Sequence, residues 1–399
     1  MRLLFVNCID PSKQIQRAYY PLSFGYLTSY ARKYGVKGLR TRYTEVGDFA
    51  NLHQVLFGEF MPHVIALTSI TENWDRAVAT ASWLKQWVPK VKIVVGGPHI
   101  SAVPSSLSRC MDVGVIGEGE QTFLELCRSK FKGDETIDGI VFWKERKLVV
   151  TKKRDLIEPL DAIPYADRSI FPRYEKRLTY VFTSRGCPYR CIFCSSSRFW
   201  ERVRFHSPLY VAGEINQLAK EGIKQICIYD DCFILDMDRV RYIRDLVKGC
   251  GVEFTIAARA DLVTDDAAEV LKSMNVTSVG MGLESNSLRV LQWLQKGNTP
   301  EINQRAVDIL RRHGLRVHCS FIRDTPIETK ADLSATMSFI KKNKLSFDLY
   351  SLMPFPNTPL WGGKEDWRAC AVRYHGRSFP RRALSWGKRK ALSIIRGSS

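Results

Sequence analysis

One short stretch decides the fold and the chemistry of this chain: Ser184-Arg185-Gly186-Cys187-Pro188-Tyr189-Arg190-Cys191-Ile192-Phe193-Cys194. Its three cysteines have the spacing C-x3-C-x2-C, and an apolar run typical of a strand, residues 179–183, precedes it. Thiolates at this spacing can surround one metal centre, and three of them leave one iron of a four-iron cluster without a protein ligand. A zinc site with His206 as the fourth ligand, or a set of reactive thiols, is the alternative interpretation.

Downstream of this stretch, apolar runs alternate with helical patterns. Six strands separated by helices predict a (β/α)6 partial TIM barrel, in which the chemistry lies on loops at the carboxyl ends of the strands. The expected strands are residues 179–183, 225–229, 253–257, 278–283, 316–322 and 348–352. The expected helices are residues 208–221, 238–248, 264–274, 300–313 and 328–342.

Upstream, the first half of the chain shows a similar alternation. Its apolar runs are nearly continuous in Val, Ile and Leu, which indicates parallel strands covered on both faces of a Rossmann-like α/β domain. The expected strands are residues 3–6, 64–68, 92–95 and 113–116, and the expected helices are 24–34 and 73–88. The expected domains are 1–138 (Rossmann-like), 139–177 (a hairpin at 140–142 and 147–150, then a Pro-containing linker), 178–360 (barrel) and 361–399 (basic tail).

Composition excludes several classes of protein. The chain has 399 residues, 45% hydrophobic and 25% charged, which is typical of two or three globular domains. No apolar run reaches the roughly 18 residues of a membrane span, and the N-terminus lacks a signal peptide, so a cytoplasmic protein is expected. An odd number of cysteines, eleven, argues against a disulfide framework.

The net charge is +19, and the last 39 residues contribute ten Lys or Arg against two acidic residues. Such a field attracts nucleic acid, anionic membranes or acidic proteins, although solvated helix faces explain it equally well. In the tail, Leu384, Ala391 and Ile395 can share one face of a basic amphipathic helix. That helix would dock on an acidic partner or a membrane surface, or close the bottom of the barrel.

The cysteine stretch resembles the radical S-adenosylmethionine (SAM) superfamily, whose motif C-x3-C-x-aromatic-C is matched by Cys187, Cys191, Phe193 and Cys194. The resemblance implies a 4Fe-4S cluster on these cysteines. Its open iron would chelate SAM, and one electron would split SAM into methionine and a 5′-deoxyadenosyl radical.

The resemblance continues along the barrel and implies the SAM contacts. Phe193 would lie near the adenine, Glu284 in Gly280-Met281-Gly282-Leu283-Glu284-Ser285 would bind the ribose, and Arg259 would bind the carboxylate. Ser320 is a further SAM candidate, and Asp230 and Asp231 either face the substrate or cap the next helix. The family's loop F-I-x-G-x-P-G-E-T has Asp324 and Ile327 here in place of its two glycines, which leaves the path of this loop open.

The first domain resembles the cobalamin-binding domain of B12-dependent radical SAM enzymes, through Val94-Val95-Gly96-Gly97-Pro98-His99 and Gly117-Glu118-Gly119-Glu120. The implied cobalamin contacts are Thr68, Ser69, Gly96, Gly97, His99, Gly117 and Glu118. The D-x-H-x-x-G motif that supplies a cobalt ligand elsewhere is absent around His53, His63 and His99. The resemblance therefore implies cobalamin bound without a histidine from that motif.

Together these features predict an anaerobic, cobalamin-dependent radical SAM C-methyltransferase that methylates an unactivated carbon through the 5′-deoxyadenosyl radical and methylcobalamin. Its acceptor would be a protein or peptide residue, such as glutamine in a methanogenic reductase, and its electron donor a ferredoxin or flavodoxin. The alternatives are a cobalamin-dependent rearrangement or cyclisation, a non-catalytic cluster and cobalamin sensor, and a tRNA methylthiotransferase. In the last case Cys8, Cys110 and Cys127 would hold a second cluster.

Overall fold

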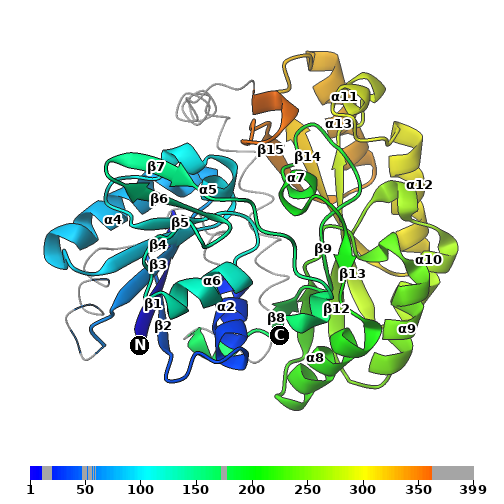
Figure 1. Ribbon diagram of the computed structural model, residues 1–399. Coiled ribbons are helices and arrows are strands. Elements are labelled where there is room, and N and C mark those ends of the chain that lie inside the picture. The colour runs from blue at the N-terminus through cyan, green and yellow to red at the C-terminus, as the bar shows by residue number, and fades with distance from the viewer. Residues whose placement is uncertain are drawn as a thin grey trace. The chain divides into compact units, whose positions relative to one another are not determined.

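The computed structural model describes residues 1–10, 20–46, 52, 56, 58, 60–171 and 178–361. The chain divides into two compact units, Met1–Tyr174 and Glu175–Ser399, and each has its own sheet and core (Figure 1). Among the described residues, no helix has both the length and the apolar character that crossing a membrane requires.

The first unit is built on a sheet with strand order β2-β1-β3-β4-β5-β6-β7. The first five strands are parallel, and this order is the flavodoxin-like form of a doubly wound sheet, whose topological switch lies between β1 and β3. Their bounds are β1 Arg2–Asn7, β2 Arg40–Glu45, β3 Val64–Thr68, β4 Lys92–Gly96 and β5 Val113–Val115. The sequence analysis missed β2 because this half-exposed edge strand, RTRYTE, has no apolar run.

Helices cover both faces of this sheet (Figure 1). On one face, the ring of Phe5 in β1 stacks on Phe24 of α2 at 4.3 Å and lies 6.1 Å from Phe123 of α6. The other face carries α4 and α5. The helix bounds are α2 Leu22–Lys33, α4 Trp74–Trp87, α5 Pro98–Ala102 and α6 Glu120–Arg128.

The predicted hairpin exists, as β6 Ile140–Lys144 and β7 Lys147–Val150, but it is part of the first sheet. β6 pairs antiparallel with β5, placing Phe142 opposite Val113, and β7 closes the edge. The first unit therefore continues well past residue 138, where the sequence analysis ended it.

The second unit is a sheet of six parallel strands in the order β15-β14-β13-β12-β11-β8, which confirms the partial barrel. Its strands are β8 Leu178–Val181, β11 Gln225–Ile228, β12 Glu253–Ala258, β13 Val276–Glu284, β14 Arg316–Arg323 and β15 Ser346–Ser351. A short antiparallel pair, β9 Ser184–Arg185 and β10 Arg204–Phe205, lies beside it. The helices are α7 Ser196–Trp200, α8 Pro208–Lys220, α9 Met237–Val247, α10 Asp265–Ser273, α11 Leu288–Trp293, α12 Pro300–Arg312 and α13 Lys330–Lys342.

The five barrel helices that the sequence predicts begin within two residues of their expected starts, and each follows an N-cap residue whose side chain accepts a backbone N–H. For example, Ser207 Oγ accepts the N–H of Tyr210, and Thr264 Oγ1 accepts the N–H of Ala267. These oxygens satisfy N–H groups that have no partner inside the helix, so they fix where α8 and α10 begin.

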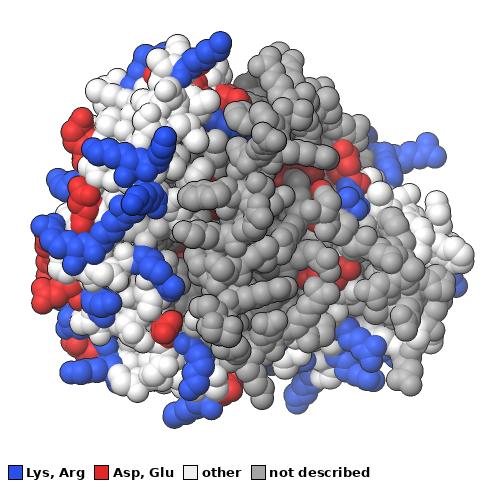
Figure 2. Space-filling view, turned by 180° about the vertical axis from the view of Figure 1, so that it is seen from behind, with Lys and Arg blue, Asp and Glu red and all other residues white. Residues whose placement is uncertain are grey.

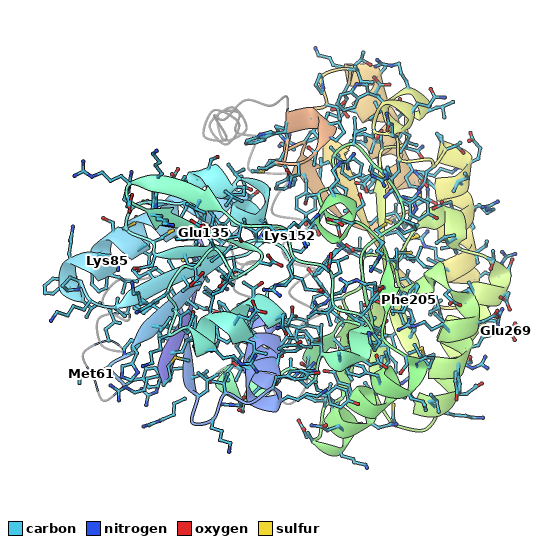
Figure 3. All side chains as sticks on the ribbon, in the orientation of Figure 1. Met61, Lys85, Glu135, Lys152, Phe205 and Glu269 are labelled. Atoms are coloured by element: carbon cyan, nitrogen blue, oxygen red, sulfur yellow. The ribbon has the colours of Figure 1, made fainter. Side chains whose placement is uncertain are left out.

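On their outer faces the barrel helices carry charges of both signs, visible beside the undescribed residues in Figure 2. Arg241 of α9 pairs with Asp238 at 2.7 Å and with Asp266 of α10, and Arg312 of α12 pairs with Asp265 at 3.2 Å. Glu269, also on α10, points outward (Figure 3). These described helix faces are therefore mixed in sign rather than a basic patch.

Candidate functional site

The cysteine loop begins with a turn that only glycine allows. Gly186 has φ +99°, and a Cβ there would lie 2.5 Å from the carbonyl oxygen of Arg202. The loop then carries Cys187, Cys191 and Cys194, at the carboxyl end of the strand that starts the barrel. This is the end where barrels of this type place their chemistry.

The three thiols have surroundings that fit an iron–sulfur cluster. The backbone N–H of Tyr189 donates to the sulfur of Cys187, and those of Ser196 and Ser197 donate to the sulfur of Cys194. Hydrogen bonds to cluster sulfurs are a main way in which proteins tune such centres. Burial raises the pKa of both thiols, so the thiolate form depends on the bound metal.

His206, the fourth ligand of the alternative zinc interpretation, faces a different environment. It is 1% exposed, and its ring stacks on that of Tyr210 with centroids 4.0 Å apart. Within the described residues, no three His, Cys, Asp or Glu side chains are arranged to hold a single metal ion.

Arg259 lies against the cysteine loop. Its Nη1 donates to Sγ of Cys191 at 3.6 Å, and its guanidinium carbon lies 3.4 Å from the ring centre of Tyr189. Its Nε and Nη2 donate to the two carboxylate oxygens of Asp261 at 3.0 and 3.2 Å. Arg259, which the resemblance assigns to the SAM carboxylate, makes a bidentate pairing with Asp261 in this structure.

Lys296, which the sequence analysis does not include among the site residues, connects three of the SAM candidates. Its Nζ lies 3.0 Å from Oε1 of Glu284, with both side chains 8% exposed, and 5.9 Å from the ring centre of Phe193. Its carbonyl accepts Nη2 of Arg259 at 2.6 Å. A Cβ on Gly282 would lie 2.3 Å from Oε1 of Glu284, so this glycine leaves room for the ion pair.

Phe193 packs against a small apolar cluster formed by Val290, Leu294 and Leu352. This wall adjoins the Glu284–Lys296 pair through the contact of Lys296 with the Phe193 ring. The arrangement can offer a flat apolar surface to a purine and a carboxylate to hydroxyl groups.

Ser320 lies in register with Gly282 of β13 and Asp348 of β15. Two residues before it, His318 Nε2 lies 3.0 Å from Oδ2 of Asp348, and Tyr350 donates to the same oxygen at 3.2 Å. The hydrogen bond from His318 holds the pKa of Asp348 below its ordinary value. The neighbouring strands therefore present small residues beside an ionised carboxylate.

Asp230 and Asp231 serve the loop rather than a helix cap. Asp230 is 4% exposed and accepts the N–H groups and hydroxyls of Thr183 and Ser184, at 2.5 to 3.2 Å. Asp231 accepts the hydroxyl of Ser196 at 2.6 Å, and the cap of α9 is Asp236. Asp230 is therefore buried and holds Thr183 and Ser184 in place, and it does not cap α9; its contact with the substrate stays a prediction.

The loop after β14 keeps a glycine-like backbone without glycine. Asp324 has φ +62°, a conformation that Asp tolerates better than most residues. Its N–H donates to Glu328 at 2.7 Å, and its carboxylate accepts the hydroxyl of Ser351 at 2.7 Å. Ile327 is not among the residues with positive φ.

In the first unit, the predicted cobalamin contacts meet at the carboxyl edge of the parallel strands. Thr68 pairs with Gly96, and the N–H of Ser69 donates to the Gly96 carbonyl at 3.4 Å. Gly97 has φ +108° and ψ −178°, and a Cβ there would lie 2.9 Å from Ser69 O and Thr68 Oγ1. Gly117 has φ +74°, with nothing within 4 Å of its Cβ position. An edge of glycines beside open space fits a large cofactor.

Two of the predicted cobalamin contacts, His99 and Glu118, have buried side chains. His99 is fully buried, stacks on Trp74 at 4.4 Å, and lies 3.2 Å from Thr71 Oγ1. Burial lowers the pKa of His99 to about 4, so the ring is neutral. Glu118 is 6% exposed and accepts the N–H of Ile157 at 2.7 Å. Both side chains therefore pack inside the unit, and their predicted contact with cobalamin stays a prediction.

His63 lies far along the sheet from these predicted contacts. His63 accepts the N–H of Arg2 at 3.2 Å, at the amino end of β1, which is the opposite edge of the sheet. His53 lies outside the described residues, as does the tail with Leu384, Ala391 and Ile395.

Cys8, Cys110 and Cys127 are spread over the unit. Cys8 follows β1 at the carboxyl edge, Cys110 precedes β5 at the amino edge, and Cys127 lies in α6. Burial raises the pKa of both Cys8 and Cys127 to about 12. This arrangement does not fit the shared second cluster of the methylthiotransferase alternative.

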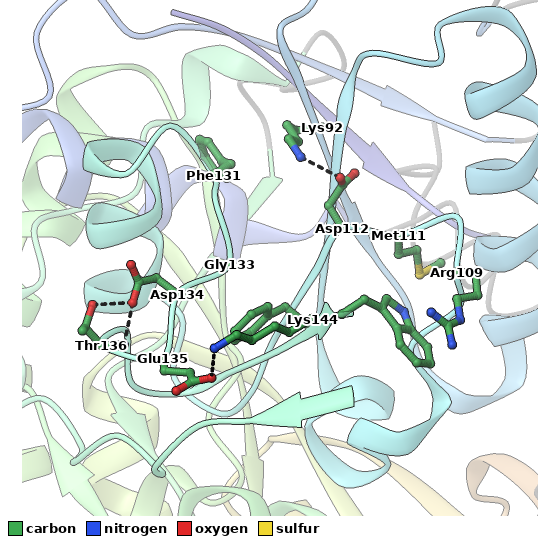
Figure 4. Close-up of a pocket in the computed structure, with 12 residues that line it drawn as sticks. Lys92, Arg109, Met111, Asp112, Phe131, Gly133, Asp134, Glu135, Thr136 and Lys144 are labelled. Atoms are coloured by element: carbon green, nitrogen blue, oxygen red, sulfur yellow. Dashed lines mark hydrogen bonds and ion pairs between the residues drawn. The ribbon is translucent and has the colours of Figure 1, made fainter. Parts of the chain in front are cut away.

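A hollow of about 650 Å³ lies at the amino edge of the same sheet (Figure 4). Lys92, the first residue of β4, pairs there with Asp112 at 2.9 Å, and Lys144 pairs with Glu135 at 2.8 Å. The hollow is thus at the opposite end of β4 from Gly96, and it is separate from the candidate cobalamin edge.

Comparison with known families agrees with both halves of this description. The profile of the radical SAM superfamily matches residues 181–340, and that of the B12 binding domain matches residues 19–127. An uncharacterised methyltransferase of Pyrococcus horikoshii is 33% identical over 356 residues, covering 86% of this chain and 77% of the relative.

A more distant relative matches this chain in sequence, and a solved structure matches it in fold. The anaerobic magnesium-protoporphyrin IX monomethyl ester cyclase of Rubrivivax gelatinosus is 27% identical, and the match covers 74% of this chain and 57% of the cyclase. The radical SAM methyltransferase TsrM of Kitasatospora setae, solved with cobalamin and a [4Fe-4S] cluster, has a TM-score of 0.72 at 18% identity. That alignment covers 90% of this chain and 76% of TsrM, and at this identity it shows the fold alone.

Proposed function

This chain belongs to the family of cobalamin-dependent radical SAM methyltransferases, and we propose that it transfers a methyl group to an unactivated carbon of a protein or peptide residue. The cysteine loop at the carboxyl end of the barrel's opening strand is the observation that carries the proposal. When bound, the 4Fe-4S cluster, SAM and cobalamin supply the electron, the radical chemistry and the methyl group.

The residues of the chain hold these groups and the substrate. Cys187, Cys191 and Cys194 hold the cluster through their thiolates. Phe193 contributes an apolar surface for the adenine of SAM, and Glu284, held in place by Lys296 at 3.0 Å, accepts hydrogen bonds from the ribose hydroxyls. In the first unit, Gly97 and Gly117 let cobalamin approach the strand ends.

The acceptor is inferred from the charge of the chain and from Asp348 of β15. A formal net charge of +19 favours attraction of an acidic macromolecule over a small neutral substrate. On the barrel strands, Asp348 lies in register with Ser320, which lies in register with Gly282, and Tyr350 donates to Asp348 at 3.2 Å. We assign Asp348 to the recognition of a hydrogen-bond donor on the methylated residue.

The test follows the methyl group itself. The full chain is reconstituted anaerobically with iron, sulfide and hydroxocobalamin, given SAM with a deuterated methyl group and reduced flavodoxin, and incubated with a protein extract digested to peptides. The proposal expects 5′-deoxyadenosine, S-adenosylhomocysteine, and peptides that carry the deuterated methyl group on carbon. Formation of 5′-deoxyadenosine with no S-adenosylhomocysteine would contradict methyl transfer and favour the cyclisation alternative.

A further inference from the structure

The guanidinium of Arg259 is almost enclosed, with the residue 5% exposed. Asp261 takes Nε and one Nη2 contact, and Nη2 also donates to the carbonyl of Lys296 and lies 3.4 Å from Oδ1 of Asn298. Nη1 is directed to the sulfur of Cys191 at 3.6 Å. The ring of Tyr189, between the first two cysteines of the motif, stacks on the guanidinium at 3.4 Å.

We propose that Arg259 is a positioning residue that raises the reduction potential of the cluster through a charge-assisted hydrogen bond to the Cys191 thiolate. The proposal rests on the cluster assignment within the proposed function. It replaces the role as ligand of the SAM carboxylate that the sequence suggested.

The direction of the expected shift in reduction potential follows from the charge of the guanidinium. Reduction of the cluster adds one electron, taken from a low-potential one-electron donor, and breaks no bond, so the cluster and its thiolates become more negative by one charge. A cation in contact with one thiolate stabilises the reduced form more than the oxidised form, most strongly where water is excluded. Asp261 opposes this effect, but it is 25% exposed and its charge is therefore better screened.

The guanidinium stays protonated throughout. Burial by itself would lower the pKa of Arg259, but the bonds to Asp261 raise it overall. Arg259 therefore supplies a fixed positive charge and gives up no proton when the electron arrives.

Arg198 provides a matched control on the same loop. Its Nη1 donates to the backbone carbonyl oxygens of Cys191 and Cys194, at 3.3 and 3.1 Å, rather than to their sulfur atoms. An arginine that braces the backbone can thus be compared with one that contacts a ligand atom.

The experiment is a redox titration of the reconstituted full chain without SAM, followed by electron paramagnetic resonance of the reduced cluster. Arg259→Gln should lower the equilibrium constant for reduction at least tenfold, which is about 59 mV for one electron. Arg259→Lys should lower it less, Arg198→Gln less than half as much, and Asp261→Asn should shift the potential upward.

An unchanged potential in Arg259→Gln, combined with weaker SAM binding, would overturn the proposal and restore the SAM role. If Arg259→Gln holds no cluster, Asp261→Asn decides, because a potential that fails to rise contradicts the charge argument. The redox titration needs neither cobalamin nor substrate. A chain that transfers no methyl group can therefore still support the proposal for Arg259. A wild-type chain that loads no cluster would instead refute the proposed function.

Discussion

The cysteine loop of the second unit and the carboxyl edge of the first unit are built in opposite ways. The loop is made of side chains, and Arg259, Asp230 and Asp231 fasten it from neighbouring strands. The edge is made of missing side chains, since Gly97 and Gly117 both have positive φ; the Cβ position of Gly117 is open, whereas that of Gly97 is filled by Ser69 and Thr68. The cluster site therefore depends on which side chains are present, whereas the cobalamin edge depends on backbone conformations that glycine adopts readily.

In the cysteine loop, the largest effect is expected from replacing Cys191. Cys191→Ala should abolish cluster loading and with it 5′-deoxyadenosine formation, because two thiolates are too few to retain the cluster. Cobalamin content should not change, since the cobalamin candidates belong to the other unit. Cys232→Ala is the control: this thiol is fully buried, its pKa is raised by burial to about 12, and we expect the cluster to load normally. SAM cleavage by Cys191→Ala would contradict the site assignment.

The cysteines of the first unit should behave as core residues. With a pKa of about 12, Cys8 and Cys127 carry about one thiolate in ten thousand at pH 8, so brief exposure to iodoacetamide should leave both unmodified. Their reactivity should rise only as the pH approaches 12. Peptide mass spectrometry measures this, and Cys110→Ala should leave about four irons per chain. Rapid alkylation of Cys8, or a loss of iron in Cys110→Ala, would revive the second-cluster interpretation.

The carboxyl edge of the first unit is tested at Gly97 and Gly117. A Cβ at Gly97 would meet neighbouring atoms, whereas a Cβ at Gly117 would meet none within 4 Å. Gly97→Ala meets both a forbidden backbone region and contacts at 2.9 Å, and should cost about 2 to 3 kcal/mol. Gly117→Ala meets only the left-handed backbone and should cost about 1 kcal/mol. Urea unfolding measures both costs.

Cobalamin retention separates structure from binding in the same pair. If the ligand lies over Gly117, its alanine variant should lose cobalamin beyond what the small stability change explains. Equal unfolding costs for the two variants would contradict the packing argument, and full retention in Gly117→Ala would remove that residue from the site.

The smallest effect is expected at the N-terminus of α13, away from both sites. Thr329 and Asp332 form a reciprocal capping box, and Thr329→Ala should cost about 1 kcal/mol, measured by urea unfolding at pH 7. Ser338→Ala, on an exposed position of the same helix, should change stability by less than about 0.5 kcal/mol.

The pH dependence of this cap has a defined sign. Hydrogen bonds from Ser287 and Thr329 lower the pKa of Asp332 in the folded state. Its contribution is therefore present above the unfolded value, about 3.9, and is lost as the pH falls below it. A Thr329→Ala cost that grows on acidification would contradict this linkage.

Sequence could predict the barrel strands and the cysteine loop because apolar runs and thiol spacing are local signals. It missed β2, whose edge position needs no apolar run, and it separated β6 and β7 from the sheet they extend. Their pairing with β5 is a contact that no local pattern records.

The site partners were harder to predict for the same reason. Asp230 meets Thr183 from 47 positions away, and Arg259 meets Cys191 from 68 positions away. Lys296 was visible in the sequence, but its bond to Glu284 depends on the space left by Gly282. Asp324 shows the converse, since it has a left-handed backbone at the position where the family pattern has glycine.

The central claim is that one chain joins a single cluster loop to a cobalamin edge. Its most direct test is the iron and cobalamin content of the full chain after anaerobic reconstitution and removal of unbound cofactor, measured by iron analysis and visible absorption. The account predicts about four irons and about one cobalamin per chain. Four irons without retained cobalamin would contradict the assignment of the first unit, and about eight irons would contradict the single-cluster site.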